Sequence, residues 1–283
     1  MNLGAFSEVD YLKVVLKKRF NVDVSTYKDS FIKRRLHSRM LATQCSDVFS
    51  YVRMLEEKPD ELKELLESLM INVSAFFRDP QVWPRLRRLV FEPLIETKVR
   101  LKGILRTLSA GCSCGEEPYS IAITIEDIAR SRGFKVTYSI TGIDLDDDAL
   151  TRARDGIYDE KELMNIPRNI LVEYFDPLAG GKFRIKNFIK EHVRFVKLDL
   201  RSCLYPKGFD VVFCRNVLIY LSDDVKKKII RALANSISMG GYLVLGLTEG
   251  LSDDFYGLFK LVDPIAKIYR KKAVTPLESQ QSP

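Results

Sequence analysis

The chain has 283 residues, of which 46% are hydrophobic and 29% charged, a balance typical of a globular protein with a sizeable core. No run approaches the roughly 18 apolar residues of a membrane-spanning helix, and the first residues lack the apolar stretch of a signal peptide. The composition therefore excludes direct membrane insertion and predicts a cytoplasmic protein.

The formal net charge is +7, and it is unevenly distributed. Residues 1–55 carry ten basic and five acidic side chains, so +5 of the total lies in the first fifth of the chain. A basic module favours an acidic partner such as nucleic acid, a membrane surface or an acidic protein. The stretch "SFIKRRLHSRM" puts four cations on the polar side of a helix, as either a solvated face or a docking face: Lys33, Arg34, Arg35 and Arg39.

Cysteine and histidine are too few and too scattered for a metal centre. The five cysteines are odd in number, which suits a reducing compartment, and only two histidines are present. A structural zinc site needs a second clustered pair or histidine ligands. No metal cofactor is expected.

Hydrophobic periodicity predicts two domains of different class. Residues 1–80 have helical spacing and are expected to form an all-helical N-terminal domain. Over residues 81–272, strand-like runs alternate with helical stretches, which predicts a mostly parallel, Rossmann-like α/β sheet. The strands are expected at 104–110, 135–144, 193–200, 209–216 and 240–247.

Two segments depart from that alternation. In residues 157–192, Gly180 and Gly181 separate two short apolar runs, which predicts a small antiparallel β insertion. Residues 273–283 are polar and contain proline, so a disordered tail is expected.

The stretch "SAGCSCGEEPYS" at 109–120 is open to three interpretations. It contains G-x-S-x-G, the nucleophile elbow of serine hydrolases, a C-x-C pair that could hold a metal, and a small-residue turn that could hold a cofactor. The elbow requires a histidine late in the chain, whereas His192 precedes a predicted strand. The metal interpretation lacks further ligands, so a cofactor loop is favoured.

The cofactor is expected to carry no phosphate. The order strand, turn, helix is that of a nucleotide-binding unit, and Gly111 and Gly115 would let a ligand approach the backbone. However, Glu116 and Glu117 would repel a pyrophosphate at the helix N-terminus. Asp144 closes the next predicted strand, where an acid can accept ribose hydroxyl hydrogens. S-adenosylmethionine, a phosphate-free nucleoside with a cationic sulfonium, fits these features.

Further polar residues follow the later predicted strands. Asp199 and Leu200 end one strand, and Arg215 and Asn216 end the next. The Asn/Asp-Pro-Pro-Tyr/Phe motif frequent in amino-group methyltransferases is absent here, which disfavours a base-N methylase. Tyr220 is open to two interpretations, a site residue or a packed aromatic near a helix cap.

Six motifs in order resemble the CheR family of chemotaxis receptor methyltransferases, from the helical domain to about residue 270. They are "NVSAFFRDP", "SAGCSCGEEPYSIA", "GIDLDDDALTRARDGIY", "EYF", "VRFVKLDL" and "FDVVFCRNVLIYL". The resemblance implies transfer of a methyl group from S-adenosylmethionine to receptor glutamate side chains. The products would be glutamate methyl esters and S-adenosylhomocysteine.

The same resemblance implies the site residues. Arg78 and Tyr220 match the family's active-site pair, and the basic helix with Lys33, Arg34, Arg35 and Arg39 becomes the receptor-docking face. Ser74 stands where threonine is common, and Asp199 where asparagine is usual. The implied cofactor contacts are Asn72, Ser74, Arg78, Glu117, Asp144, Asp199, Leu200, Arg215 and Asn216.

The implied partners are the cytoplasmic domains of methyl-accepting chemotaxis receptors, met by a monomer that binds no nucleic acid. Two alternatives remain: an RNA methyltransferase that uses the basic face on phosphates, and a non-catalytic module that senses S-adenosylmethionine. In tethered family members the β insertion docks a receptor's C-terminal peptide through a longer loop. The compact "FDPLAGGKFRI" here favours an enzyme that needs no tether.

Overall fold

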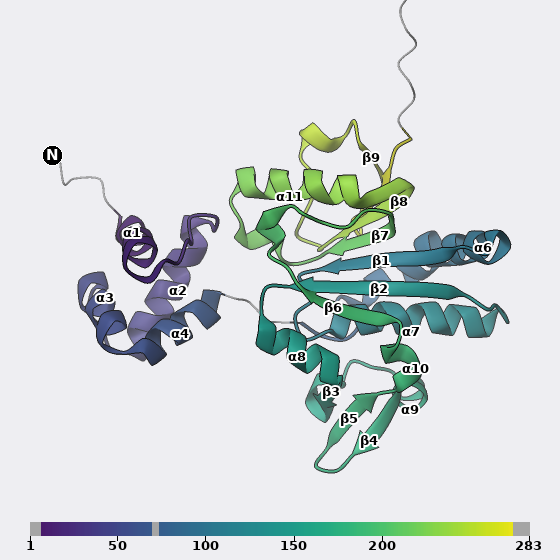
Figure 1. Cartoon of the computed structure of the whole chain (residues 1–283), viewed down its shortest axis with the longest axis horizontal. Coiled ribbons are helices and arrows are strands. Elements are labelled where there is room, and N and C mark those ends of the chain that lie inside the picture. The colour runs from purple at the N-terminus through teal and green to yellow at the C-terminus, as the bar shows by residue number, and fades with distance from the viewer. Residues whose placement is uncertain (1–6, 70–73, 274–283) are drawn as a thin grey trace, which may run out of the picture. The chain divides into compact units, whose positions relative to one another are not determined.

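The computed structural model describes residues 7–69 and 74–273 and divides them between two compact units (Figure 1). We call residues 7–69 with 220–227 the helical unit, and residues 74–219 with 228–273 the sheet unit. The predicted cofactor residue Asn72 lies outside the described residues, and so do residues 274–283 of the predicted tail. Among the described residues, no helix is both long and apolar enough to cross a membrane.

Four helices build most of the helical unit: α1 (Glu8–Phe20), α2 (Asp29–Ala42), α3 (Val48–Glu57) and α4 (Pro59–Leu69). Their first turns carry local signals, since a capping box joins Ser7 to Asp10 and Asp47 caps α3. Apolar side chains at helical spacing meet in one core, which includes Leu12, Leu16, Ile32, Leu36, Tyr51, Leu55 and Leu65.

The segment 220–222 belongs to this unit although it lies far along the chain. It runs antiparallel to residues 26–28, because the Lys28 amide donates to the Tyr220 carbonyl at 2.9 Å and the Ser222 amide to the Thr26 carbonyl at 2.9 Å. The Tyr220 ring packs on Phe31, with ring centroids 4.9 Å apart. Tyr220 is thus held by backbone pairing and by an aromatic contact with α2.

A charged group is buried inside the helical unit. Glu61 of α4 is 8% exposed, and Arg39 of α2 donates to it through Nε at 2.9 Å and Nη2 at 2.6 Å. The Tyr51 hydroxyl donates to the same carboxylate at 2.7 Å. Although burial opposes the effect, these hydrogen bonds hold the pKa of Glu61 below its ordinary value.

The sheet unit begins with short helical segments that lead into the first strand. These are η1 (Pro80–Val82), α5 (Trp83–Leu86), η2 (Arg87–Phe91) and α6 (Glu92–Leu101). Trp83, Val90, Phe91 and Ile95 bury their side chains in the main core. The chain therefore stays helical for about twenty residues beyond the predicted end of the helical domain.

The central sheet has seven strands in the order β6-β2-β1-β7-β8-β10-β9, and β1, β2, β6, β7 and β8 pair in parallel (Figure 1). Their bounds are β1 (Ile104–Ala110), β2 (Thr137–Asp144), β6 (Val193–Lys197), β7 (Phe209–Cys214) and β8 (Ile237–Leu245). The predicted parallel, Rossmann-like sheet is confirmed. Four of its strands start within two residues of the expected positions.

Helices connect the parallel strands, as the alternating pattern requires. They are α7 (Glu116–Ser131) after β1, α8 (Asp147–Asp155) after β2 and α11 (Asp223–Ser236) before β8, with η5 (Leu218–Tyr220) after β7. Short η4 (Leu200–Ser202) follows β6, and η6 (Asp253–Phe255) follows β8. The buried apolar face of α7, which includes Ile121, Ile125 and Ile128, packs into the main core.

The predicted antiparallel insertion is a three-stranded sheet in the order β3-β5-β4. Its strands are β3 (Ile157–Asp159), β4 (Phe175–Leu178) and β5 (Lys182–Ile185), accompanied by η3 (Glu160–Glu162), α9 (Arg168–Tyr174) and α10 (Asn187–Lys190). Gly180 and Gly181 both have positive φ, at 76° and 69°, and turn β4 into β5. The predicted small antiparallel β insertion is confirmed.

The far end of the sheet differs from the sequence-based expectation. β8 begins at Ile237, three residues before the predicted strand, and its pairing with β7 shifts register between Phe209 and Val211. Two antiparallel strands, β9 (Phe259–Asp263) at the edge and β10 (Ile268–Lys271) between β8 and β9, were not predicted. Each is only four or five residues long and interrupted by charged residues, so no clear period marks them.

We expect Arg39→Met to destabilise the helical unit by about 2–4 kcal/mol near pH 7, because it leaves the buried Glu61 carboxylate without its cation. The lowered pKa means that this pairing stabilises the fold above the unfolded-state pKa. The contribution is lost as the pH falls through the lowered folded-state pKa. The cost measured by hydrogen exchange of α2 amides should therefore shrink towards acidic pH.

Arg34→Met is the matched control, since it removes an exposed arginine of the same helix. An equal loss of protection in both variants, or a loss in Arg39→Met that does not change with pH, would contradict the buried-pair account.

Candidate functional site

The predicted cofactor residues of the sheet unit lie at the carboxyl ends of the parallel strands of the central sheet. β1 lies between β2 and β7, and the chain runs from β1 to β2 and β6 before it crosses to β7. This reversal of strand order is the topological switch point, where open α/β sheets bind ligands at the carboxyl ends of their strands. Glu117 follows β1, Asp144 ends β2, and Arg215 and Asn216 follow β7.

Asp144 binds the loop that follows β1. Its Oδ2 accepts from the Ser113 amide at 2.8 Å, and its Oδ1 accepts from the amides of Leu145 at 2.7 Å and Asp146 at 3.1 Å. Burial raises the pKa of Asp144, and the three amides oppose that rise. The carboxylate is therefore oriented by backbone while its oxygens keep further lone pairs for a ligand.

Arg215 joins three segments that are distant in sequence. Its side chain is 2% exposed and donates to Glu117 at 3.3 Å, to Asp79 at 2.8 Å and to the carbonyl of Arg78 at 3.2 Å. The Ser109 hydroxyl also donates to Glu117 at 2.7 Å. Burial raises the pKa of Glu117, and Arg215 is the main opposing influence. The buried charge of Arg215 is thus compensated by two carboxylates.

This arginine brings the segment 74–79 to the switch point, and we call the region at these strand ends the cofactor crevice. The Ser74 hydroxyl hydrogen-bonds to Glu116, whose pKa is raised by burial. The Arg78 carbonyl also accepts from Trp83 Nε1 at 3.0 Å, so the backbone that carries Arg78 is fixed from two sides. Asp79 was not predicted as a site residue, although it lies inside the quoted "NVSAFFRDP" motif.

Several buried polar atoms here have no hydrogen-bond partner in the part of the chain that the structure describes. They are Ser113 Oγ, Glu116 Oε2, Arg215 Nε and Asn216 Oδ1. Buried polar groups are normally satisfied, so such a set at a switch point indicates a polar ligand that offers both donors and acceptors. S-adenosylmethionine, with ribose hydroxyls, an ammonium group and a carboxylate, fits that requirement.

Asp199 and Leu200 lie just beyond the end of β6. The Asp199 carboxylate accepts from the Arg201 amide at 2.8 Å and pairs with the Arg201 guanidinium at 2.7 Å. Although partial burial opposes the effect, these bonds hold the pKa of Asp199 below its ordinary value. Next to it, the Leu198 amide donates to the Asp144 carbonyl at 2.8 Å, which ties this loop to the end of β2.

Glu249 is a second acidic residue that the sequence analysis did not select. It is 5% exposed in the turn after β8, and it accepts hydrogen bonds from the amides of Asn216, Leu218 and Ile219. In sequence it is a single acid in "LTEGL", without a partner at a recognisable spacing. Only the folded chain brings it to the segment after β7.

The two glycines of the loop after β1 have a packing role that the sequence analysis did not predict. A Cβ on Gly111 would lie 2.5 Å from Val217 Cγ2, and one on Gly115 would lie 3.0 Å from both Ala153 and Phe195. Both residues also have positive φ. Neighbouring side chains therefore occupy the space that the missing Cβ atoms leave at these two positions.

The structure argues against the hydrolase and metal interpretations of the same loop. Ser113 follows the carboxyl end of β1, whereas His192 precedes β6 and stacks on Tyr138 at 4.2 Å. Burial raises the pKa of the Cys112 and Cys114 thiols. Within residues 7–69 and 74–273, no group of three or more histidine, cysteine, aspartate or glutamate side chains could hold a metal ion.

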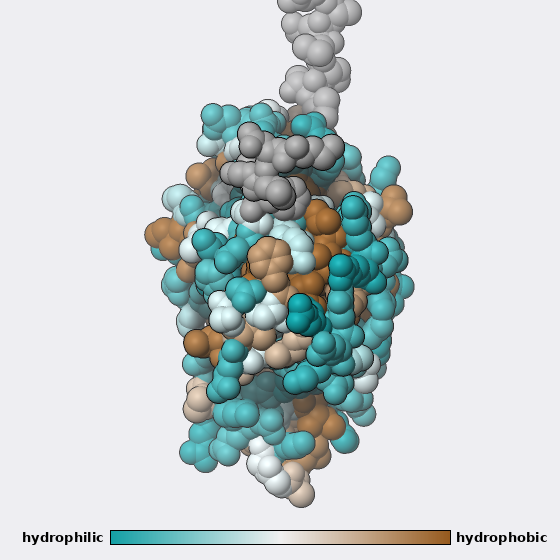
Figure 2. Space-filling view, turned by 90° about the vertical axis from the view of Figure 1, so that its left-hand side faces the viewer, coloured by the Kyte–Doolittle hydropathy of each residue, from teal (hydrophilic) through white to brown (hydrophobic). Residues whose placement is uncertain are grey.

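The predicted docking cations of α2 fall into two groups. Lys33 and Arg34 are exposed, and Arg35 is half-buried with its guanidinium 5.4 Å from the Phe31 ring centroid. Arg39, in contrast, is engaged by Glu61 inside the helical unit. Figure 2 views the molecule from the left-hand side of Figure 1. The face that it shows is mostly hydrophilic, and its hydrophobic residues lie in separate patches.

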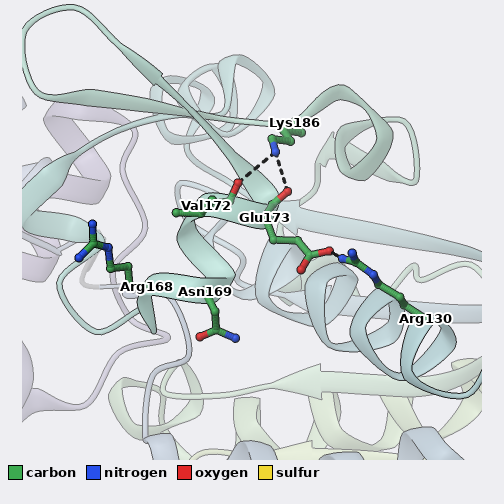
Figure 3. Close-up of a pocket in the computed structure, with 6 residues that line it drawn as sticks. All are labelled: Arg130, Arg168, Asn169, Val172, Glu173 and Lys186. Atoms are coloured by element: carbon green, nitrogen blue, oxygen red, sulfur yellow. Dashed lines mark hydrogen bonds and ion pairs between the residues drawn. The ribbon is translucent and has the colours of Figure 1, made fainter.

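An open pocket beside the β insertion contains none of the predicted site residues (Figure 3). Two of its three cations are engaged by the protein itself: Lys186 donates to the carbonyls of Val172 at 3.1 Å and Glu173 at 2.8 Å, and Arg130 pairs with the Glu173 carboxylate. Asn169 and Arg168 complete the lining. We assign no part of the cofactor site to this pocket.

Two family descriptions match the chain in succession. Residues 7–70 match "CheR methyltransferase, all-alpha domain", and residues 72–265 match "CheR methyltransferase, SAM binding domain". The chain belongs to the CheR methyltransferase family. The predictions of the family, the fold class, S-adenosylmethionine as cofactor and methyltransferase activity are confirmed, and the two alternative functions receive no support from these comparisons.

Similar proteins cover nearly the whole chain. A chemotaxis protein methyltransferase of Listeria innocua serovar 6a is 34% identical over 261 residues, covering 90% of this chain and 95% of that protein. Chemotaxis protein methyltransferase 1 of Pseudomonas aeruginosa is 30% identical, covering 95% and 99%. The chemotaxis protein methyltransferase of Escherichia coli K12 is 30% identical, covering 88% and 86%.

We expect Asp144→Asn to weaken the binding of S-adenosylhomocysteine by about 1–3 kcal/mol in titration calorimetry. The amide replaces one acceptor oxygen with a donor, so a ribose hydroxyl or a loop amide loses its partner. Asp148→Asn is the control, because it removes the same charge from an exposed position on α8. Equal affinity of both variants and the unaltered protein would remove Asp144 from the binding site.

Proposed function

We propose that the protein transfers a methyl group from S-adenosylmethionine to glutamate side chains of methyl-accepting chemotaxis receptors, forming glutamate methyl esters. The observation that carries the proposal is the match of both family domains, in order, over residues 7–70 and 72–265. We propose a cytoplasmic site of action, because the receptor's methylation helices belong to its cytoplasmic domain.

The proposed reaction requires little proton transfer by the protein. A glutamate side chain has an unperturbed pKa of about 4.3, so it is an ionised nucleophile at neutral pH without a general base. When bound, S-adenosylmethionine supplies an electrophilic methyl group. The chain's own contribution is orientation, for which holding the reactants in line can supply roughly 7–11 kcal/mol.

We assign the binding of the cofactor to the residues at the switch point. Asp144 would accept the ribose hydroxyls, and Glu117 with Arg215 would form the charged floor of the crevice. The remaining proposed contacts are Asn72, Ser74, Arg78, Asp199, Leu200 and Asn216. The support for this assignment is the buried, partly unsatisfied polar set described above.

Arg78 and Tyr220 are the proposed residues for orienting the substrate glutamate. A guanidinium that paired tightly with the carboxylate would weaken it as a nucleophile, so we assign Arg78 a positioning role. The Tyr220 hydroxyl can donate one hydrogen bond to a carboxylate oxygen without neutralising it. Tyr220 is fixed by its pairing with residues 26–28, which supports a preorganised role.

The test is transfer of tritiated methyl groups from S-adenosylmethionine to a receptor cytoplasmic fragment, followed by mild base. We expect label in the fragment that base releases as methanol, since a methyl ester is hydrolysed whereas a methylated nitrogen is not. Label that resists base, or label that enters RNA in place of the fragment, would contradict the proposal.

The same assay tests our proposal that the enzyme needs no tether. The hairpin of β4 and β5 has a compact turn at Gly180 and Gly181, which leaves little loop backbone for pairing with a peptide. A fragment that lacks its C-terminal tail should therefore be methylated at nearly the rate of the full fragment. A large drop in rate on removal of the tail would contradict this proposal.

We expect the double reversal Arg34→Glu with Arg35→Glu to raise the KM for the receptor by at least about tenfold at low salt, because an acidic partner is then repelled. The increase should diminish at high salt, and the affinity for S-adenosylhomocysteine should not change. The control is Lys17→Glu with Lys18→Glu, an equal change of charge on exposed residues of α1.

An unchanged KM after the α2 reversal would remove that helix from the docking face. An equal effect of the α1 and α2 reversals would show that net charge alone governs the encounter.

A further inference from the structure

Glu249 is a buried carboxylate that accepts four backbone hydrogen bonds. Its Oε2 accepts from the amides of Asn216 at 2.9 Å and Gly246 at 2.7 Å. Its Oε1 accepts from the amides of Leu218 at 2.8 Å and Ile219 at 3.2 Å. Since a carboxylate is an acceptor on every side, it can satisfy four donors that converge on one point.

Three of those four donors lie in residues 215–219, which run from the end of β7 into η5 and which we call the connection. Asn216 has the left-handed φ of 62°, a conformation that most residues adopt only at a cost in energy. The next side chain, Val217, packs directly over Gly111 in the loop after β1. The connection is therefore fixed by the carboxylate beneath its amides and by a contact with the cofactor loop.

The connection carries the residues that close one side of the cofactor crevice. Arg215 begins it, and Asn216 follows with a buried Oδ1 that has no partner in the described part of the chain. Ile219 ends it and directly precedes Tyr220. A shift of this backbone would move an acceptor that the cofactor is proposed to meet.

We propose that Glu249 is a positioning residue for cofactor binding: its charge holds residues 215–219 in the conformation that presents Asn216 to S-adenosylmethionine. The inference rests on the cofactor-binding part of the proposed function. It assigns Glu249 no contact with the cofactor itself, because both carboxylate oxygens are directed at backbone amides.

The four converging amides require a carboxylate at this position, and a neutral polar side chain of the same shape does not replace it. Glutamine has nearly the same shape, but its amide group places a donor where one oxygen stood. If the amide nitrogen of the glutamine replaced Oε1, it would face the amides of Leu218 and Ile219, which are donors themselves. If it replaced Oε2, it would face the amides of Asn216 and Gly246. Either choice releases part of the connection, so Glu249→Gln should loosen the segment without an added void.

The chain supplies a matched control in Asp263, at the end of β9. This carboxylate is 6% exposed and accepts from the amides of Ile265 at 2.9 Å and Ala266 at 2.7 Å and from Arg85 at 2.7 Å. It fixes the turn between β9 and β10, and none of its partners is a proposed cofactor residue. Asp263→Asn therefore imposes a similar chemical change outside the crevice.

The experiment compares the full chain with Glu249→Gln and Asp263→Asn by calorimetry with S-adenosylhomocysteine and by amide exchange. We expect Glu249→Gln to raise the Kd by about tenfold and to accelerate exchange in the peptide that covers residues 216–219. Asp263→Asn should lower the thermal stability but leave the Kd within about twofold of the unaltered value.

A second variant serves if Glu249→Gln does not fold. A Cβ on Gly246 would lie 2.7 Å from Glu249 Oε2 and 2.8 Å from the Asn216 backbone nitrogen. Gly246→Ala should therefore push the Glu249 carboxylate away from the Asn216 amide without removing the charge of Glu249. It too should raise the Kd. An unaltered Kd in a folded Glu249→Gln or Gly246→Ala protein would overturn the inference, whereas absence of binding by the unaltered chain would overturn the cofactor assignment first.

Discussion

The buried guanidinium of Arg215 is the interaction on which the organisation of the crevice depends. A cation that is 2% exposed is costly to bury unless it is paired, and here Glu117 and Asp79 supply the opposite charges. Glu117 opens α7, Asp79 precedes the helices that lead into β1, and Arg215 follows β7. Satisfying one charge therefore forces three chain segments to meet beside the switch point of the sheet. The Arg78 backbone is placed by the same interaction, because its carbonyl accepts from Arg215.

The crevice is built from carboxylates where phosphate-binding folds use free helix amides. Glu116 and Glu117 occupy the first turn of α7, and Asp144 takes up the Ser113 amide that precedes that helix. Acidic side chains at a helix N-terminus are stabilised by the helix dipole, but they exclude a pyrophosphate. A ligand with hydroxyl groups and positive charge is compatible with this arrangement. The family match to a domain that binds S-adenosylmethionine gives the same answer from independent information.

The sequence predicted those features that depend on local pattern. Alternating strand and helix periods located the parallel strands, and the same pattern placed Asp144, Arg215 and Asn216 at the carboxyl ends of those strands. It did not identify Asp79 or Glu249, because their partners lie 136 and 33 residues away and no short-range spacing marks them. The contact between Gly111 and Val217 was not predicted either, since only the tertiary structure brings Val217 over Gly111. The pairing of Arg39 was not predicted for the same reason, because its partner Glu61 lies on another helix. A cation that was predicted to face a receptor is therefore paired inside its own unit.

A crystal structure of the full chain with S-adenosylhomocysteine tests most directly whether the cofactor binds at the switch point beside Asp144 and Arg215. We expect the ligand to lie across the carboxyl ends of β1, β2 and β7, and its ribose hydroxyls to donate hydrogen bonds to Asp144. Arg215 should remain paired with Glu117 and Asp79. A ligand bound away from these strand ends, or a ribose that makes no contact with Asp144, would contradict this assignment.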